Sequence, residues 1–437
     1  MNIKKALLNK KSKIAVWGTG YIGLSSMVYF ASKGVICKGY DVDRHKVNMI
    51  NKGILTIPEL KDWFNIDIKK LSKKKLLSAT SNYSDIIVPD YHVHLLAIPT
   101  EKNGKPYFDI LFDVLKKISI LIKKKTKPII IVESTLTPKF TNKFILPFLN
   151  KLGVNDDDYI LGIAPRRDWF VANTKTIENL DRVVGAKNLK EGLLIKSILS
   201  IVCKKLHVAS TYSVSEMVKS IENAYRHMEI TLANQLSLAY KDYDMREVLR
   251  LVGTKWNIGT YFPGFGTGGY CIPLSSQYVL REVKEKEKLT LLRETIKTDN
   301  DINILIAKSI IKRKIKSVAV LGLSYKGNLK VDVLSPTIPF VKYLNKKKIK
   351  VNLFDPFYTK KEIKDKTGLE SFIYPTELAK YDCVVICVDH DLFKKNFHTT
   401  KKYLTKCKFI LDNMAVWKNY DIPKNINYKI SGEKNWI

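Results

Sequence analysis

Residues 13–23 read Lys13-Ile-Ala-Val-Trp-Gly18-Thr-Gly20-Tyr-Ile-Gly23, and this stretch decides the fold. The apolar run predicts a buried strand, and the three glycines that follow have the spacing of a dinucleotide-binding turn at the start of a helix. Gly18 permits the tight turn, Gly20 lets the backbone approach a pyrophosphate, and Gly23 allows close helix–strand packing. The helix would then present its unpaired N–H groups to the phosphates.

The next predicted strand, residues 35–40, is followed by Asp41, about where an acidic residue meets the adenosine ribose. A carboxylate there accepts a hydrogen bond from the 2′-hydroxyl and repels a 2′-phosphate. We therefore expect NAD to be preferred over NADP, although Arg44 nearby opposes that preference.

Alternating strands and helices define the organisation of the chain, with one interruption. Such alternation implies parallel βαβ units. A long helix predicted over 214–238 interrupts the alternation. The further strands are predicted at 93–98, 128–132, 159–163, 182–184, 317–323, 351–355, 383–388 and 409–412. The expected fold class is α/β, with two Rossmann-like, doubly wound parallel-sheet domains joined by a long central helix. The expected domains are an NAD-binding Rossmann-like domain (1–212), a central helical and dimerisation region (213–310) and a C-terminal α/β domain (311–437).

A second glycine-rich segment, residues 261–273, contains Gly264, Gly266, Gly268 and Gly269 and then Cys271. Glycines there let the backbone pass close to a ligand and keep the sulfur accessible. The pattern favours a nucleophilic cysteine over a buried structural one.

Two polar residues of the predicted central helix, Lys219 and Asn223, are four positions apart and therefore share one face. The spacing alone does not separate a functional lysine from one that lies along the surface.

The chain has 437 residues and a formal net charge of +33, for which two explanations compete. One is a polyanionic partner such as nucleic acid, and the other is lysine spread over solvated faces. The lysines form short runs, such as 73–75, 123–125 and 346–348, without the interleaved aromatic residues that stack on bases. This distribution favours the second explanation, and no nucleic-acid partner is expected.

The remaining composition indicates a cytoplasmic location. No apolar run approaches the roughly 20 residues of a membrane helix, and the basic start lacks the features of a signal peptide. The six cysteines show neither a Cys-x-x-Cys pair nor histidines at zinc spacing, which indicates free thiols in a reducing compartment and no metal site.

Seven segments resemble the UDP-glucose/GDP-mannose dehydrogenase family in their residues, order and spacing. The resemblance covers nearly the whole chain. The segments are Gly18-Thr-Gly-Tyr-Ile-Gly-Leu24, Ala97-Ile-Pro-Thr100, Val132-Glu-Ser-Thr135, Asp181-Arg-Val-Val-Gly185, Glu216-Met-Val-Lys-Ser-Ile-Glu-Asn223, Gly268-Gly-Tyr-Cys-Ile-Pro273 and Leu321-Gly-Leu-Ser-Tyr-Lys326.

The resemblance implies a four-electron oxidation of the C6 hydroxyl of a UDP-hexose to the UDP-uronate, with two NAD, to supply surface polysaccharide precursors. Cys271 would form a thiohemiacetal and then a thioester, from which water releases the uronate. UDP-glucose is the first expectation for the sugar, and UDP-N-acetylmannosamine or UDP-N-acetylglucosamine is the alternative. The central helix would form the interface of a homodimer.

The resemblance also implies roles for individual residues. The expected catalytic residues are Cys271, Lys219, Asn223 and Thr135. Lys219 would stabilise the oxyanion. The expected cofactor-binding residues are Gly18, Gly20, Tyr21, Ile22, Gly23, Asp41, Lys46, Thr100 and Glu133. The expected substrate-binding residues are Lys219, Asn223, Phe265, Gly266, Gly268 and Lys326, the last from the C-terminal UDP-sugar-binding domain.

Three positions depart from the family pattern. Ser275 stands where the family has a carboxylate that assists general-base chemistry, and Arg166 stands where it has a glutamate. Val333 replaces an arginine that contacts ligand. Because neither serine nor arginine replaces a carboxylate base, we expect either slow hydrolysis of the thioester, with Asp168 as a substitute base, or a homologue that binds without full turnover.

Overall fold

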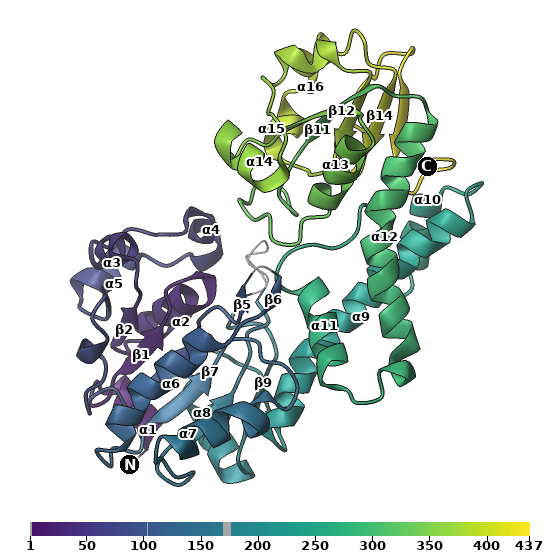
Figure 1. Cartoon of the computed structure of the whole chain (residues 1–437). Helices are drawn as coiled ribbons and strands as arrows, with labels where there is room; N and C mark the ends of the chain where they lie inside the picture. The colour runs from purple at the N-terminus through teal and green to yellow at the C-terminus, as the bar shows by residue number, and fades with distance from the viewer. Residues whose placement is uncertain (1, 103, 169–175) are drawn as a thin grey trace. The chain divides into compact units, whose positions relative to one another are not determined.

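The structure is a computed structural model that describes residues 2–102, 104–168 and 176–437 (Figure 1). The chain divides into two compact units, residues 1–221 and 222–437. The finer division into three regions, with boundaries at 212 and 310, stays a prediction.

The first unit is built on an eight-stranded sheet in the order β10-β9-β8-β7-β4-β1-β2-β3. Its central strands are short apolar runs that are buried along their whole length, as expected for a parallel sheet covered on both faces. The expected doubly wound parallel arrangement is confirmed, except that β9 runs antiparallel to β8. The strands are β1 (Ile14–Trp17), β2 (Cys37–Tyr40), β3 (Leu77–Thr80), β4 (Val93–Leu96), β7 (Ile129–Val132), β8 (Ile160–Ile163), β9 (Arg182–Ala186) and β10 (Leu206–Ala209).

Several helices of this unit bury apolar residues in the core around the sheet. In α6 the buried residues Leu111, Leu115, Ile118 and Ile122 recur at helical spacing, and Figure 1 shows this helix crossing one face of the sheet. The helices are α1 (Ile3–Leu8), α2 (Tyr21–Ser32), α3 (Arg44–Asn51), α4 (Lys61–Phe64), α5 (Ile68–Lys73), α6 (Asp109–Ile122), α7 (Leu146–Lys151) and α8 (Leu189–Leu199), with a small hairpin of β5 (Glu101–Lys102) and β6 (Lys105–Pro106).

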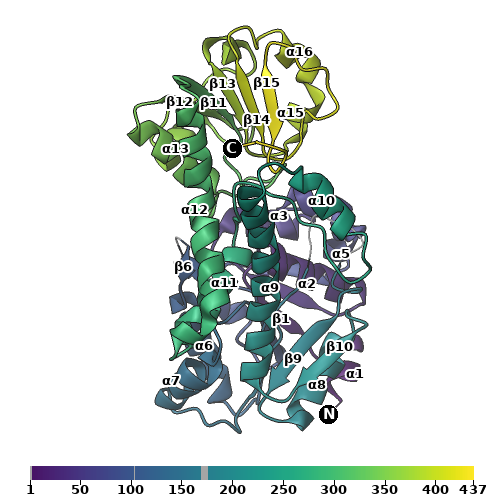
Figure 2. The same ribbon diagram turned by 90° about the vertical axis from the view of Figure 1, so that its right-hand side faces the viewer.

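The second unit contains a five-stranded, fully parallel sheet in the order β12-β11-β13-β14-β15. Alternate residues of β11 enter two cores: Val318 and Val320 share one with Phe340, and Ala319 shares the other with Phe393. Figure 2 shows α13 on one side of this sheet and α15 and α16 on the other. The strands are β11 (Ser317–Leu321), β12 (Lys350–Phe354), β13 (Cys383–Ile386), β14 (Phe409–Asp412) and β15 (Asn427–Ile430). The helices are α10 (Met245–Val252), α11 (Ile272–Glu282), α12 (Thr290–Lys312), α13 (Thr337–Lys346), α14 (Lys360–Thr367), α15 (Asp391–Lys395) and α16 (Phe397–Lys401).

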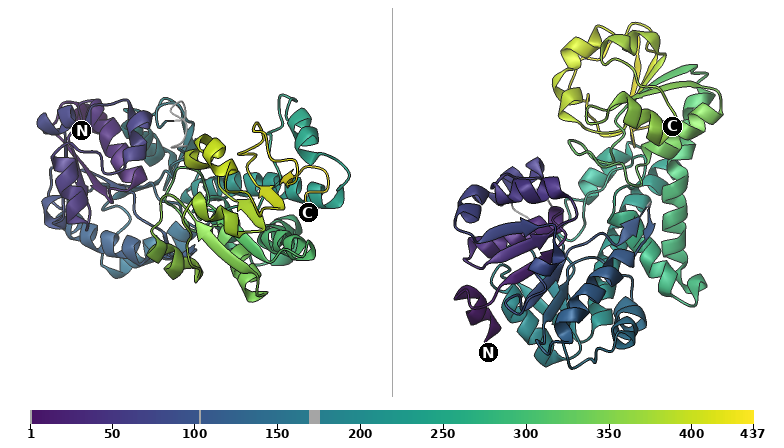
Figure 3. Two further views of the ribbon diagram at one scale, coloured as in Figure 1. Left: turned by 90° about the horizontal axis from the view of Figure 1, so that it is seen from above. Right: turned by 60° about the vertical axis from the view of Figure 1, so that its left-hand side comes forward.

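The predicted central helix is α9 (Tyr212–Ala239), 28 residues long. Its second half belongs to the second unit and runs beside α12 (Figure 3), where Gln235 Nε2 donates to Thr298 Oγ1 at 3.0 Å. This pair of helices forms the support on which the segment before Cys271 lies. In the described part of the chain, no helix is both long and apolar enough to cross a membrane.

Candidate functional site

The glycine turn after β1 leaves space for a ligand at the start of α2. Gly18 has a φ of 86°, and a Cβ there would lie 2.6 Å from the carbonyl oxygen of Ala97. A Cβ on Gly23 would collide with the carbonyl oxygen of Gly18, whereas one on Gly20 would meet no atom within 4 Å. Gly20 is the N-cap of α2 and offers no side-chain cap to the first N–H groups. The turn therefore fits the pyrophosphate of a dinucleotide.

Asp41 lies directly after β2 and faces this turn. Its Oδ2 accepts from the backbone N–H and the hydroxyl of Thr19 at 2.9 and 2.6 Å, and its Oδ1 accepts from the N–H of Asp43. Burial opposes ionisation of Asp41, but these hydrogen bonds outweigh it and lower its pKa. The carboxylate is thus held negative, as an acceptor for a ribose hydroxyl must be.

The other predicted cofactor residues of the first unit lie at or near strand ends. Tyr21 and Ile22 form the first turn of α2, and Lys46 is half-buried in the first turn of α3. The hydroxyl of Thr100 donates to the carbonyl oxygen of Thr135 at 2.8 Å, which joins the chain after β4 to the chain after β7. Each of these residues stays a prediction for its role.

Glu133 belongs to a buried network that the sequence did not reveal. Its carboxylate accepts from Ser26 on α2 and from Arg182 on β9, each at 2.5 Å. Arg166 Nη1 lies 3.6 Å from the same carboxylate, and Arg166 Nε donates to Asp168 at 2.6 Å. Because all these groups are buried, they hold the chain after β8 against α2.

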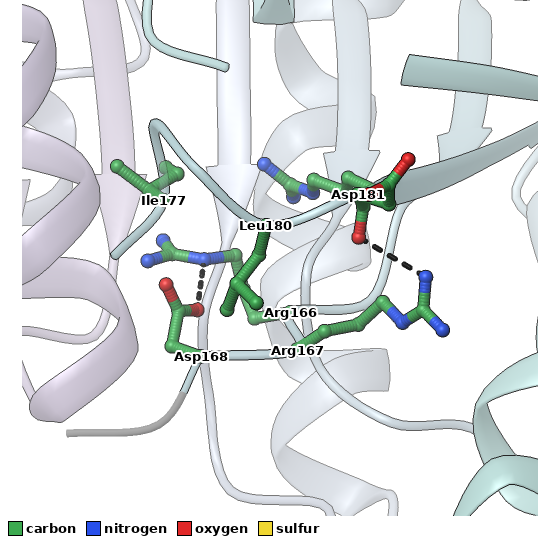
Figure 4. A pocket seen from close by; sticks show the side chains of 7 residues that line it. Arg166, Arg167, Asp168, Ile177, Leu180 and Asp181 are labelled. Carbon is green, nitrogen blue, oxygen red and sulfur yellow. Dashed lines mark hydrogen bonds and ion pairs between the residues drawn. The ribbon is translucent and has the colours of Figure 1, made fainter. Parts of the chain in front are cut away.

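Arg166 is therefore a packing residue within the first unit (Figure 4). It also donates to both Ser25 and Ser26. Burial opposes its charge, but Asp168 and Glu133 outweigh burial and raise the pKa of Arg166. Figure 4 shows Asp168 turned toward Arg166, and its side chain is 2% exposed. Its position offers little support for the proposed substitute base.

Cys271 differs from the other cysteines in its accessibility. All six cysteines lie in the described residues, and Cys271 alone is exposed, whereas burial raises the pKa of each of the remaining five. Cys271 is the N-cap of α11, where the positive end of the helix dipole interacts favourably with a negative sulfur. Its position suits a nucleophile.

Asn223 and Ser275 are hydrogen-bonded in the second unit. Asn223 Nδ2 donates to Ser275 Oγ at 2.9 Å, and the two residues are 4% and 2% exposed. Ser275 also donates its backbone N–H to the carbonyl oxygen of Cys271 at 3.1 Å. The serine at the family's carboxylate position is thus one helical turn beyond the thiol. Lys219 lies one turn before Asn223 on α9 and is half-buried.

The segment before Cys271 packs against the loop that follows β11. The N–H of Gly269 donates to the carbonyl oxygen of Val333 at 2.8 Å, and a Cβ on Gly268 would lie 2.6 Å from the Cβ of Tyr325. Burial raises the pKa of Tyr325, and negative charge on Cys271 raises it further. Tyr325 was not predicted from the sequence, where the only indication of a role for it was its place beside Lys326.

The other predicted substrate residues divide into backbone and side-chain roles. The ring of the buried Phe265 packs against that of Phe340 in the core, with 5.0 Å between the ring centroids. A contact of Phe265 with substrate would therefore be made by its backbone. Gly266 has a φ of 106°. Burial lowers the pKa of Lys326, while Asp389 acts in the opposite direction. Lys326 is a partly desolvated cation, and such a charge suits the binding of an anionic group.

Comparison with known proteins gives matches to one family along the chain. Three domain models of the UDP-glucose/GDP-mannose dehydrogenase family match this chain: the NAD binding domain at residues 12–202, the central domain at 213–301 and the UDP binding domain at 319–419. Protein CapL of Staphylococcus aureus is 29% identical over 91% of this chain and 95% of its own length. UDP-N-acetyl-D-glucosamine 6-dehydrogenase of Pseudomonas aeruginosa is 26% identical, with coverage of 92% and 96%. The solved structure of the UDP-D-ManNAc dehydrogenase from Pyrococcus horikoshii superposes with a TM-score of 0.82 at 25% identity and covers 97% of this chain and 100% of that one.

Proposed function

Because this chain belongs to the UDP-glucose/GDP-mannose dehydrogenase family, we propose that it oxidises the C6 hydroxyl of a UDP-N-acetylhexosamine to the uronate with NAD. The chain is a nucleotide-sugar dehydrogenase by family, and it carries the NAD-binding domain at residues 12–202. The observation that carries the mechanism is Cys271, an exposed thiol at the start of α11 in a glycine-rich loop.

The choice of sugar follows the relatives rather than the first expectation. UDP-glucose was expected from the Gly268–Cys271 run, but relatives with coverage above nine-tenths are named as dehydrogenases of UDP-N-acetyl-D-glucosamine and UDP-N-acetyl-D-mannosamine. These names support the alternative that the sequence had left open. The sugar is therefore proposed to carry a 2-acetamido group.

Two molecules of NAD, bound one after the other, would each supply the hydride acceptor for one oxidation at C6, and the C6 hydroxyl would release its proton to water in the first. After the first, the thiolate of Cys271 adds to the aldehyde carbon and the carbonyl oxygen becomes that of a thiohemiacetal. The second oxidation turns this carbon into a thioester, and water then adds while the sulfur leaves as thiolate. The products are the uronate and the free thiol, so the enzyme returns to its starting state.

Four further side chains are proposed to assist these steps. We assign Lys219 to stabilise the developing oxyanion, because a positive charge aimed at that oxygen lowers the barrier. Asn223 would orient the C6 oxygen or a water, and Thr135 would position a water. Lys326 would bind the diphosphate, for which its partly desolvated charge is suited.

A homodimer that uses α9 completes the proposal. Tyr225 and Leu232 are seven residues apart on one face of the helix and are 63% and 54% exposed. Large apolar side chains exposed on one helix face mark an interaction surface. Light scattering during gel filtration should give about twice the 50.1 kDa mass of one chain.

A panel of UDP-sugars tests the proposed function. Purified protein is incubated with NAD and, separately, with UDP-N-acetylglucosamine, UDP-N-acetylmannosamine or UDP-glucose, and both NADH and uronate are measured. We expect one of the N-acetyl sugars to give uronate with two NADH for each product. A rate with UDP-glucose that equals or exceeds both would contradict the assigned sugar, and no NADH with any sugar would contradict the assigned activity.

A further inference from the structure

Thr267 lies in the middle of the glycine-rich segment and is bound twice by one carboxylate. Its backbone N–H donates to Asp299 Oδ1 at 2.8 Å, and its hydroxyl donates to Asp299 Oδ2 at 2.6 Å. Asp299 belongs to α12 and is 6% exposed. Both oxygens of a buried acid on a long helix are therefore committed to a residue four positions before Cys271.

His227 on α9 extends this contact to the other side of Cys271. Its Nε2 lies 3.1 Å from Asp299 Oδ2 and 3.4 Å from Thr267 Oγ1. Its Nδ1 lies 2.9 Å from Ser276 Oγ on α11, five residues after Cys271. His227 and Ser276 are 1% and 0% exposed.

The proton positions of this cluster follow from its acceptors. A carboxylate only accepts, and the Thr267 hydroxyl gives its proton to Asp299, so the nitrogen that faces both oxygens, Nε2, carries a proton. Nδ1 pairs with the Ser276 hydroxyl, so each ring nitrogen has a hydrogen-bond partner, as is usual for a buried histidine.

We propose that His227 and Asp299 are a positioning pair that fixes Cys271 by holding the chain on both sides of it. The proposal rests on the role of Cys271 in the proposed function. The segment needs such support because its glycines have more conformational freedom than other residues. The His227 ring contacts Asp299, Thr267 and Ser276, so it joins α9 and α12 to the residues on both sides of Cys271.

The expected consequence is a loss of rate rather than of binding. Misplacement of a reacting group by about 1 Å costs on the order of 100-fold. The expected NAD contacts lie in other segments and do not depend on where the sulfur lies, so KM for NAD should change much less than kcat.

The test compares two variants of Thr267 with a matched control on α12. Thr267→Val keeps the shape and the backbone N–H but removes the hydroxyl, and Thr267→Ser keeps both donors. Thr295→Val is the control, because the buried Thr295 hydroxyl bonds only within its own helix, to the carbonyl oxygen of Leu291 at 2.8 Å. His227→Phe removes the second member of the pair.

Two measurements on the full chain decide the outcome: hydrogen exchange of the peptide 264–276, and kcat and KM for the UDP-sugar and NAD. For Thr267→Val and His227→Phe we expect exchange at least about tenfold faster and kcat about 10- to 100-fold lower, with KM for NAD within about twofold of the wild type. Thr267→Ser and Thr295→Val should match the wild type in both measurements.

Unchanged exchange in Thr267→Val would overturn the proposal, and so would faster exchange with an unchanged kcat. If His227→Phe does not fold, the two Thr267 variants still decide. Absence of NADH from the wild type with every UDP-sugar contradicts the proposed function instead, and hydrogen exchange then decides by itself whether the pair holds the segment.

Discussion

The two glycine-rich loops of the chain are held in place in different ways. In the turn after β1, the surrounding backbone requires Gly18 and Gly23, since a side chain at Gly23 would meet the carbonyl oxygen of Gly18 and one at Gly18 would meet that of Ala97, after β4. In the segment before Cys271, side chains from distant positions hold the backbone: Asn234 and Asn413 bind the N–H groups of Gly264 and Phe265, and Asp299 binds that of Thr267.

This difference separates a local motif from an assembled one. The first loop carries most of its structural requirements within eleven residues, with Ala97 as the outside contact, and a side chain at Gly20 would meet no atom within 4 Å. The second loop depends on α9, α12 and the loops of the second sheet. Substitutions within the first loop should therefore be enough to disturb its structure. The second loop should also be disturbed by substitutions in the distant elements that hold it.

The largest effect should come from the second loop, through removal of its thiol. Cys271→Ala should lower uronate formation by more than about 1,000-fold, because no covalent intermediate forms, while NAD affinity stays within about twofold. Cys407→Ala, at a buried cysteine, is the matched control and should retain activity. Mass spectrometry of the product and calorimetric titration with NAD give the two quantities, and full uronate production by Cys271→Ala would rule out the covalent mechanism.

The next effect separates the two kinds of glycine within the first loop. Gly23→Ala should lower both the melting temperature and NAD affinity, the latter by about 100-fold, because the added methyl group collides with the Gly18 carbonyl. Gly20→Ala meets no protein atom, so it should leave the melting temperature unchanged and weaken only NAD binding. Equal melting temperatures for the two variants would contradict this distinction.

A smaller effect is expected at Asp41, which connects the first loop to cofactor choice. Asp41→Asn should weaken NAD binding by about tenfold and reduce the discrimination against NADP, because the carboxylate repels a 2′-phosphate. Dissociation constants for both cofactors provide the measurement. An unchanged preference would place Asp41 away from the ribose.

The same variant has an expected pH signature. Since the pKa of Asp41 is lowered in the folded chain, its ionisation contributes stability above the unfolded value of about 3.9, and that contribution is lost as pH falls through the folded pKa. Denaturant unfolding should therefore show Asp41→Asn less stable than the wild type at pH 7, with a difference that shrinks below about pH 4. A difference that is constant with pH would contradict the assigned hydrogen bonds.

The smallest change is a gain in the second loop. Ser275→Asp places a carboxylate one turn beyond Cys271, and general-base assistance is typically worth about 100-fold or more in the assisted step. If hydrolysis limits the wild type, NADH appears in an initial burst. In the variant we expect the steady-state rate to rise several-fold, limited by the buried Asn223 contact, and that burst to become smaller. Linear NADH production by the wild type, with no gain in the variant, would show that another group already activates the water.

The fold could be predicted because its signals are local. Apolar runs such as 129–132 and the glycine spacing at 18–23 define the strands and the first turn, and both sheets follow. Strands β3, β10 and β15 were not predicted, because their sequences mix polar with apolar residues and lack the continuous apolar run of a strand such as β7. The antiparallel direction of β9 could not be predicted either, since a strand's own residues do not specify its direction.

Only those site residues that belong to a recognisable sequence motif could be predicted. Cys271 stands out by the glycines before it. Tyr325, His227 and Asp299 contact the residues around it from other elements, and no sequence spacing connects them. Arg166 shows the opposite case. Its position suggested a lost catalytic group, whereas its contacts with Glu133, Asp168 and α2 show a buried packing role.

The most direct test of the central claim is to trap the intermediate on Cys271. The wild-type enzyme is mixed with NAD and its best UDP-N-acetylhexosamine, quenched with acid within the first turnover, digested and examined by mass spectrometry, with NADH and uronate counted in a parallel sample. The account predicts the mass of the oxidised UDP-sugar on the peptide that contains Cys271, and two NADH for each uronate. Uronate formed at the full rate with an unmodified Cys271 peptide, or with one NADH per product, would contradict it.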